Sequence, residues 1–264
     1  DQAAEALRDA DVAMYEAKQK GKARYVVFDE SMRQVAQRHL QLEHDLRKAL
    51  AGEQLSLAYQ PVISLASGEL VGVEAVVHWE HPAEGVIDPA EFVPIAEESD
   101  LIYALGTWAL SAACQQMREW IDELGNFAPH MISINLSRKQ FARRDFAEVV
   151  QQSLTQAGIA PDRLQIELSE DVLSGDPETA LQTMHQLREQ GIRFAIANFC
   201  ASNGSFAILH RLPIQMLKVD RSLLEHIEHS KYPASLLHAL AVLVRNLGIV
   251  LVANGVNRQS QWLA

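Results

Sequence analysis

Short apolar segments alternate with helical patterns along most of this 264-residue chain, and this alternation limits its fold more than any other feature. The segments are rich in Val, Ile and Leu, which is typical of strands that helices cover on both faces. Repeated strand–helix units predict an α/β fold, namely a TIM-like (β/α)8 barrel. The predicted strands span residues 55–62 and 70–79 as a hairpin, then 131–136, 164–168, 194–199, 216–219 and 249–253, with helices between the later strands and a last helix over 233–247.

The carboxyl ends of the predicted strands are the places to look for a site, because barrels of this type carry their chemistry there. One of these residues, Lys218, lies in the apolar segment "MLKV", whereas the preceding strand ends in the uncharged pair Ala197-Asn198. A lysine in an apolar strand needs a counter-charge, and the neighbouring strand offers none. The full set of strand-end candidates is Glu74, Asn135, Glu167, Ala197, Asn198, Lys218 and Asn254.

The first 50 residues follow a different pattern. Residues 1–29 predict one short helix and a strand over Tyr25–Phe28, too little to bury a core, so we interpret them as the end of a larger domain. Residues 30–50 predict an amphipathic linking helix with a solvated charged face. The predicted organisation is therefore a remnant over 1–29, a linking helix over 30–50 and the α/β domain over 51–264.

Composition excludes several classes of protein. The formal net charge is −11, which argues against binding to a nucleic-acid polymer. Two cysteines far apart offer neither a disulfide framework nor zinc-ligand spacing, so we expect a cytoplasmic protein. We find no run of about 18 apolar residues, so we expect no membrane contact from this part of the protein.

Six sequence motifs together resemble one known family. The segment "GVEAVVHWEHPAEGVIDPAEFVPIAEESDLI" is similar to the signature of EAL domains, the bacterial phosphodiesterases for cyclic di-GMP, with Glu74-Ala75-Val76 in place of Glu-Ala-Leu. The other motifs occur in the family's order: "AYQPVISLASGELVG", "ISINLSRKQF", "IELSED", "LPIQMLKVDRS" and "LVANGVN". The resemblance covers about residues 50–264. It also implies a last strand, carrying a Gln-Gly motif, which we expect beyond Ala264.

The N-terminal segment "DADVAMYEAKQKGKARYVVFD" resembles the last helix and strand of a GGDEF (diguanylate cyclase) domain, the usual partner of an EAL domain. It lacks that family's signature loop. The resemblance therefore implies a GGDEF remnant to which we assign no cyclase activity.

The resemblance implies a hydrolytic site with two Mg²⁺ or Mn²⁺ ions held by carboxylate and amide oxygens, with a lysine that positions water. Glu74, Asn135, Glu167 and Lys218 match the family's residues. The two adjacent aspartates are replaced by Ala197 and Asn198. The glutamate of a later Ala-Glu-Gly motif is replaced by Asn254, and a second acid three residues further on by Asn257. Each lost carboxylate–ion contact near 4 Å forgoes on the order of 4 kcal/mol at an effective dielectric of about 20. We therefore predict that the two-metal site is lost.

Binding of cyclic di-GMP is a separate question. The resemblance implies a ligand site formed by Gln60, Glu74, Val76, His78, Asn135, Glu167 and Lys218. His78 replaces the family's phosphate-binding arginine, and a histidine is a weaker, single-point donor than a bidentate guanidinium. Loss of acidic groups, in contrast, lowers repulsion toward a dianionic ligand. These two effects oppose one another.

Three functions follow from these observations. The first is a catalytically degenerate EAL domain that acts as a cyclic di-GMP receptor or interaction module, read by a signalling partner protein and forming a homodimer. The second is a protein-binding scaffold that no longer recognises the nucleotide. The third is a residually active phosphodiesterase. The first is our prediction, with no metal cofactor.

Overall fold

The computed structural model describes residues 7, 9–10, 13–14, 25–173, 176–199, 209–225, 227 and 231–263. They divide into two compact units, one from residues up to 55 together with 79–101, the other from residues 56–78 and 102–264. None of the helices in these described residues is long and apolar enough to cross a membrane.

The first unit contains helix α2 (Glu30–Leu50), the end of strand β2 (Leu70–His81), strand β3 (Gly85–Ile87) and helix α3 (Pro89–Glu98). The predicted helix over residues 30–50 is confirmed as α2, which Asp29 caps by accepting a hydrogen bond from the backbone N–H of Ser31 at 2.8 Å. This helix is not solvated all round. Its second half buries Leu42, Leu46 and Ala49 completely, so it belongs to the core of its unit.

The core of the first unit forms around Trp79, which is fully buried and meets the ring of Phe92 edge to face at 5.5 Å. Polar side-chain pairs surround this core. Arg38 of α2 forms ion pairs with Glu84 and Glu91, and Asp45 lies 3.4 Å from His81 Nε2. Apolar burial and these pairs together hold α2 to α3 and to the β2–β3 hairpin.

The predicted strand over Tyr25–Phe28 is wrong, because these residues form neither helix nor strand. Tyr25 and Val27 are 90% and 75% exposed. A strand needs a hydrogen-bonded neighbour, and no described strand pairs with this segment. The described residues before it, namely 7, 9–10 and 13–14, are helical as expected.

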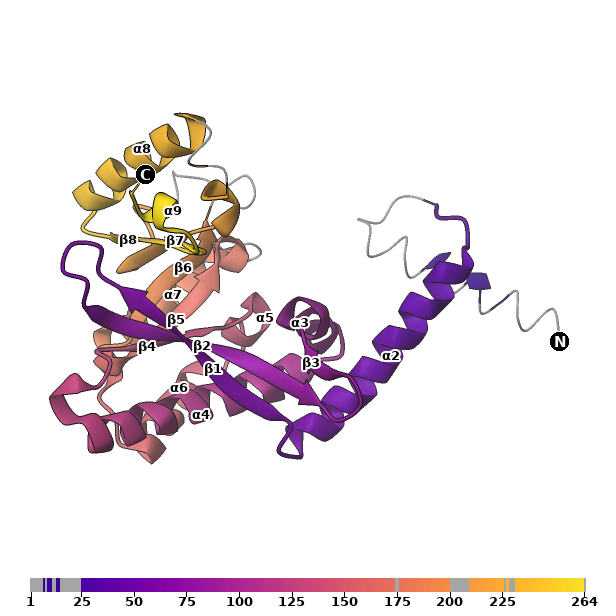
Figure 1. Cartoon of the computed structure of the whole chain (residues 1–264). Helices are drawn as coiled ribbons and strands as arrows, with labels where there is room; N and C mark the ends of the chain where they lie inside the picture. The colour runs from indigo at the N-terminus through magenta and orange to yellow at the C-terminus, as the bar shows by residue number, and fades with distance from the viewer. Residues whose placement is uncertain are drawn as a thin grey trace. The chain divides into compact units, whose positions relative to one another are not determined.

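The second unit is built on a curled, largely parallel sheet in the order β1-β2-β4-β5-β6-β7-β8, with β3 pairing only with β2 (Figure 1). Every neighbouring pair from β2–β4 to β7–β8 is parallel. The α/β class is confirmed. Among the described residues the sheet is open, since β1 and β8 are the ends of its order.

The strands occur where the sequence predicts them. Their bounds are β1 (Leu55–Ile63), β4 (Ile132–Asn135), β5 (Leu164–Ser169), β6 (Arg193–Phe199), β7 (Met216–Val219) and β8 (Val250–Ala253). The helices of this unit are α4 (Leu101–Leu124), α5 (Arg138–Phe141), α6 (Phe146–Ala157), α7 (Pro177–Glu189), α8 (Lys231–Asn246) and α9 (Gln259–Leu263), with short 3₁₀ turns η1 (Gly125–Phe127), η2 (Pro161–Arg163), η3 (Glu170–Leu173) and η5 (Arg221–Leu223). The helix predicted between β6 and β7 lies largely outside the described residues.

Alternation along the strands separates two layers of side chains. Leu164, Ile166 and Leu168 of β5 are at most 1% exposed and belong to the main core with residues of the covering helices. The residues between them, Gln165 and Glu167, point to the opposite face because successive strand side chains alternate. On that inner face, Met131, Ala195 and Met216 form a small buried apolar cluster. Polar residues lie further along the strands toward their carboxyl ends.

Candidate ligand site on the inner face of the sheet

Four side chains from four strands meet on the inner face. They are Glu74 of β2, Asn135 of β4, Glu167 of β5 and Lys218 of β7, which we call the inner polar cluster. All four were candidates from the sequence, and the structure brings them together. Parallel strand order explains why, because adjacent parallel strands end at the same edge.

Lys218 is the centre of the inner polar cluster. Its side chain is completely buried, and its Nζ donates a hydrogen bond to Glu74 Oε2 at 2.6 Å. The same ammonium group forms an ion pair with the buried carboxylate of Glu167. The missing counter-charge of Lys218 therefore comes from β2 and β5, while the adjacent strand β6 contributes none.

The second contact of Glu74 is with Asn135, whose Nδ2 donates to Glu74 Oε1 at 2.6 Å. Asn135 is the register partner of Glu167 on the neighbouring strand. Glu74 therefore has one oxygen bound by an ammonium and the other by an amide. The cluster holds two carboxylates and one ammonium, which gives it a formal charge of −1 when all three are ionised.

Two buried polar residues lie deeper on the same face. Gln165 Nε2 donates to Ser133 Oγ at 3.0 Å, and the two residues are 1% and 0% exposed. Neither was a candidate from the sequence, although each precedes a candidate by two positions (Ser133 before Asn135, Gln165 before Glu167). The two-residue period of a strand was the signal that would have placed them on the inner face.

Burial raises the pKa of Glu167 above its ordinary value of 4.5, and the neighbouring carboxylate of Glu74 raises it further. Lys218 opposes this through its charge and its hydrogen bond, and a hydrogen bond from Ser133 also opposes it. Desolvation is the largest cause.

Ala197 and Asn198 of β6, which stand where the resemblance implies two aspartates, differ in exposure and backbone conformation. Ala197 is 5% exposed, lies in register with Ser169 of β5, and has no side-chain donor or acceptor. Asn198 is exposed and has a φ of +54°, at an irregularity in the β6–β7 register between Ile196 and Phe199. Asparagine and aspartate tolerate this left-handed conformation better than most residues, which fits a polar residue at this kink.

The two asparagines near the chain end lie just beyond β8. The backbone N–H of Asn254 donates to Val219 O at 3.4 Å, which continues the pairing of β8 with β7. Asn257 is exposed, and its backbone N–H is bound by Gln261 Oε1 at 2.9 Å. Within the described residues, neither side chain forms a hydrogen bond or ion pair with the inner polar cluster.

The remaining predicted ligand residues lie on β1 and β2. Gln60 of β1 is exposed, and Val76 and His78 of β2 are half-buried. In the described part of the chain none of the three forms a hydrogen bond with the cluster. The structure therefore joins four of the predicted site residues, and it leaves Gln60 on the neighbouring strand β1 and Val76 and His78 further along β2.

No group of three or more His, Cys, Asp or Glu side chains that could hold a metal ion occurs among the described residues. The inner polar cluster contributes only two carboxylates, and both form ion pairs with Lys218.

Comparisons with known proteins identify the family. The model of the EAL domain matches residues 43–264. The chain is 39% identical over 257 residues to the bifunctional diguanylate cyclase/cyclic di-GMP phosphodiesterase MucR of Pseudomonas aeruginosa, covering 97% of this chain and 37% of that protein. It is 33% identical to the cyclic di-GMP phosphodiesterase NbdA of the same organism, covering 99% of this chain and 33% of the relative. The chain thus spans about a third of the length of these curated relatives.

A solved structure agrees with the fold. The MucR phosphodiesterase in complex with c-di-GMP superposes with a TM-score of 0.79 at 38% identity, covering 84% of this chain and 90% of that one. The open, curled sheet with its covering helices is therefore the TIM-like fold that this structure shares. On the family match, the sequence identity and this superposition, the chain belongs to the EAL domain family, the family of the cyclic di-GMP phosphodiesterases.

Proposed function

We propose that this EAL domain binds cyclic di-GMP and does not hydrolyse it, and that its occupancy is read by a partner protein. The observation that carries this proposal is the pairing of Lys218 with both carboxylates of the inner polar cluster. The resemblance to proteins that act on or bind cyclic di-GMP supports the choice of ligand.

The residues of the cluster do not fit a pair of divalent ions. Two such ions carry roughly four positive charges and need several carboxylate oxygens at short distance. Here the cluster has two carboxylates, and an internal ammonium already neutralises part of their charge. Ala197, on the strand between those of Glu167 and Lys218, has no ligand atom. We therefore derive no hydrolytic step for this domain.

The same cluster retains groups suited to a nucleotide. Asn135 is exposed at the strand end and offers an amide, and the side chain of Glu74 is 14% exposed. His78 supplies a single-point donor in place of a bidentate guanidinium. We therefore propose that binding is weaker than it would be with an arginine at residue 78, and that Gln60, Val76, His78 and the cluster form the ligand site.

Calorimetry with cyclic di-GMP, in the presence and in the absence of Mg²⁺, tests this function. We expect submillimolar binding that does not depend on Mg²⁺, and tighter binding by the His78→Arg variant. As a matched control, Arg118→Met removes an exposed ion pair on α4 and leaves the affinity unchanged. Incubation with Mn²⁺ should give no linear dinucleotide above the buffer control.

Each other outcome supports a different function. Absence of nucleotide binding in the wild-type protein and in His78→Arg would support a scaffold that binds proteins only. Turnover with Mn²⁺ would support a residually active phosphodiesterase and would overturn our proposal of a lost metal site.

We further propose the organisation to which the sequence points. Residues 1–29 are the end of a GGDEF domain, residues 30–50 are a linking helix, and residues 51–264 belong to the EAL domain. We also propose a cytoplasmic homodimer. Limited proteolysis of a longer chain that includes the upstream segment, followed by light scattering of the EAL fragment, would test both proposals.

A further inference from the structure

The inner polar cluster depends on the position of Asn135, the last residue of β4, whose amide donates to Glu74. The chain turns immediately after this residue. The backbone N–H of Leu136 donates to Glu167 O at 3.0 Å, and Ser137 then begins the four-residue helix α5. The position of α5 therefore determines the direction of the backbone immediately after Asn135.

Gln140 is the side chain that fixes α5. It is only 6% exposed, and both ends of its amide are used. Its Oε1 accepts the backbone N–H of Ser137 at 2.8 Å, which completes a capping box. Its Nε2 donates to the carbonyl oxygen of Ile102, in the first turn of α4, at 2.8 Å. A capping box needs only the first of these bonds, so the second, which ties α5 to α4, requires its own explanation.

The space for the second bond exists because residue 106 is glycine. A Cβ added at Gly106 would lie 1.4 Å from Gln140 Nε2, far inside any contact distance. Gly106 lies in the second turn of α4, inside the helix, where glycine costs roughly 1 kcal/mol relative to alanine. Helix α4 thus has a residue of low helix propensity, Gly106, at the position where the Gln140 side chain contacts it.

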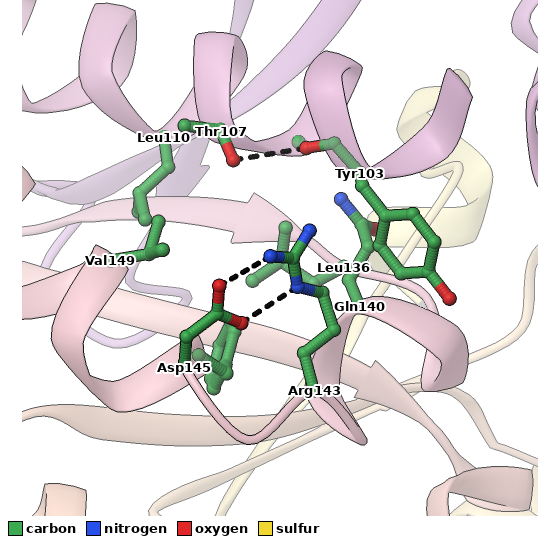
Figure 2. Close-up of a pocket in the computed structure, with 10 residues that line it drawn as sticks. Tyr103, Thr107, Leu110, Leu136, Gln140, Arg143, Asp145 and Val149 are labelled. Atoms are coloured by element: carbon green, nitrogen blue, oxygen red, sulfur yellow. Dashed lines mark hydrogen bonds and ion pairs between the residues drawn. The ribbon is translucent and has the colours of Figure 1, made fainter. Parts of the chain in front are cut away.

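The surroundings of Gln140 show why hydrogen bonds decide its orientation. A small hollow of about 20 Å³ lies beside it between α4 and the α5–α6 segment. Figure 2 shows Gln140 on the wall of this hollow, next to Tyr103 and Arg143, with the guanidinium of Arg143 bound by Asp145. Gln140 borders this hollow, and its two amide hydrogen bonds, from Ser137 N–H and to Ile102 O, fix its orientation.

We propose that Gln140 is a positioning residue for the ligand site: by tying α5 to α4 through the gap at Gly106, it holds Asn135 against Glu74. This proposal rests on the proposed function only for its effect on nucleotide affinity. Its effect on the Asn135 amide is a property of the free protein.

The experiment compares three variants by the side-chain amide signals of Asn135 in ¹H–¹⁵N spectra of the free protein, assigned by their loss in Asn135→Ala. Gln140→Glu keeps the oxygen that completes the capping box but places a carboxylate against Ile102 O, so the variant should fold without the tie. Gly106→Ala displaces Gln140 by a different route. Ser153→Ala is the matched control, since it removes one buried hydrogen bond, from Ser153 Oγ to Val149 O, on α6.

We expect both Gln140→Glu and Gly106→Ala to shift the Asn135 signals and to weaken cyclic di-GMP binding by about tenfold, similar to the lower end of the loss seen when a partner that orients a metal-binding side chain is removed. Ser153→Ala should leave both the Asn135 signals and the affinity unchanged. Unchanged Asn135 signals in both test variants would overturn the proposal. If the wild-type protein fails to bind the nucleotide, the proposed function is wrong, while the amide signals still decide the role of Gln140.

Discussion

Lys218 Nζ lies 2.6 Å from Glu74 Oε2, although the two residues are 144 positions apart in the chain. This contact joins strands β2 and β7, which are not neighbours in the sheet. Glu167 forms the second ion pair of the same ammonium from β5. One lysine thus connects three strands across the inner face, in a place where the resemblance to the family implies divalent cations.

The first prediction concerns the removal of that lysine. Lys218→Met should lower the free energy of unfolding by about 3–5 kcal/mol, because it leaves buried carboxylates without a counter-charge. Urea denaturation measures this change. The triple variant Lys218→Met/Glu74→Gln/Glu167→Gln should regain most of the loss, since replacing a whole buried charge cluster by neutral groups is often close to neutral.

Arg118→Met provides the control for this prediction. It removes the exposed pair between Arg118 and Asp122 and should cost no more than about 1 kcal/mol. An equal loss in Arg118→Met and Lys218→Met would mean that Lys218 acts only as one more ion pair. A triple variant as unstable as Lys218→Met would show that charge is not the cause.

The second prediction concerns pH and Glu167. Burial raises the pKa of Glu167 above 4.5, so the folded protein holds this proton more tightly than the unfolded chain does. The contribution of Glu167 to stability is therefore full below about pH 4.5 and is lost as the pH rises through the raised pKa. Glu74, Lys218 and Ser133 face the same group.

The measurement is the difference in free energy of unfolding between wild type and Glu167→Gln, by urea denaturation at a series of pH values. We expect this difference to move against the wild type as the pH rises above about 4.5, and to level off above the raised pKa. A difference that stays constant with pH would show that Glu167 has the same pKa in both states.

Much of this site could be predicted from the sequence, and its limits have physical causes. Strand ends in a parallel sheet share one edge, so Glu74, Asn135, Glu167 and Lys218 were expected together. The ion pairs of Lys218 could not be predicted, because they depend on distances between side chains on strands that are not adjacent. The tie through Gln140 and Gly106 was also missed, since it depends on a close approach of two helices that no periodicity records.

In the N-terminal region, too, the sequence pattern predicted some features correctly and others wrongly. Amphipathic spacing correctly predicted α2, but it could not show which part of its apolar face is buried. Local pattern also predicted a strand over residues 25–28, where β-forming residues have no described partner strand. Strand formation depends on such a partner more than on propensity.

The third prediction concerns Asp45 on α2. A hydrogen bond from Gln41, followed by contacts with Lys48 and His81, lowers the pKa of Asp45 from 3.8 to about 2. A lowered pKa stabilises the folded unit above about pH 4, and this stabilisation is lost as the pH falls toward 2. Asp45→Asn should therefore destabilise α2 at neutral pH and have a much smaller effect near pH 2.

Hydrogen exchange at the backbone amides of Leu46 and Ala49 measures the stability of this helix. Glu43→Gln is the control on the same helix, because it removes only a pair with Arg47, whose side chain is 62% exposed. If the amides of α2 are equally protected from hydrogen exchange in Asp45→Asn and in wild type at neutral pH, Asp45 does not stabilise the helix.

The fourth prediction restores the carboxylates that the family has and this chain lacks. The variant Ala197→Asp/Asn198→Asp/Asn254→Glu should gain Mn²⁺ binding that calorimetry detects at submillimolar concentration, because it adds three hard oxygen ligands at the positions where the resemblance implies metal-binding carboxylates. Asn198 has a φ of +54°, a conformation that aspartate also tolerates, so this substitution should not disturb β6.

The specific control is the same triple variant with Glu167→Gln added, which should lose the gained Mn²⁺ binding, since Glu167 is the carboxylate nearest the centre of the cluster. Wild type should show no binding heat under the same conditions. A triple variant that folds and still binds no Mn²⁺ would mean that the pairing of Lys218 with Glu74 and Glu167, and not the missing acids, prevents metal binding. If the triple variant does bind Mn²⁺, its activity on cyclic di-GMP is measured next. Hydrolysis would show that the wild-type domain lacks only the metal ligands, and metal binding without hydrolysis would show that other catalytic features are lost as well.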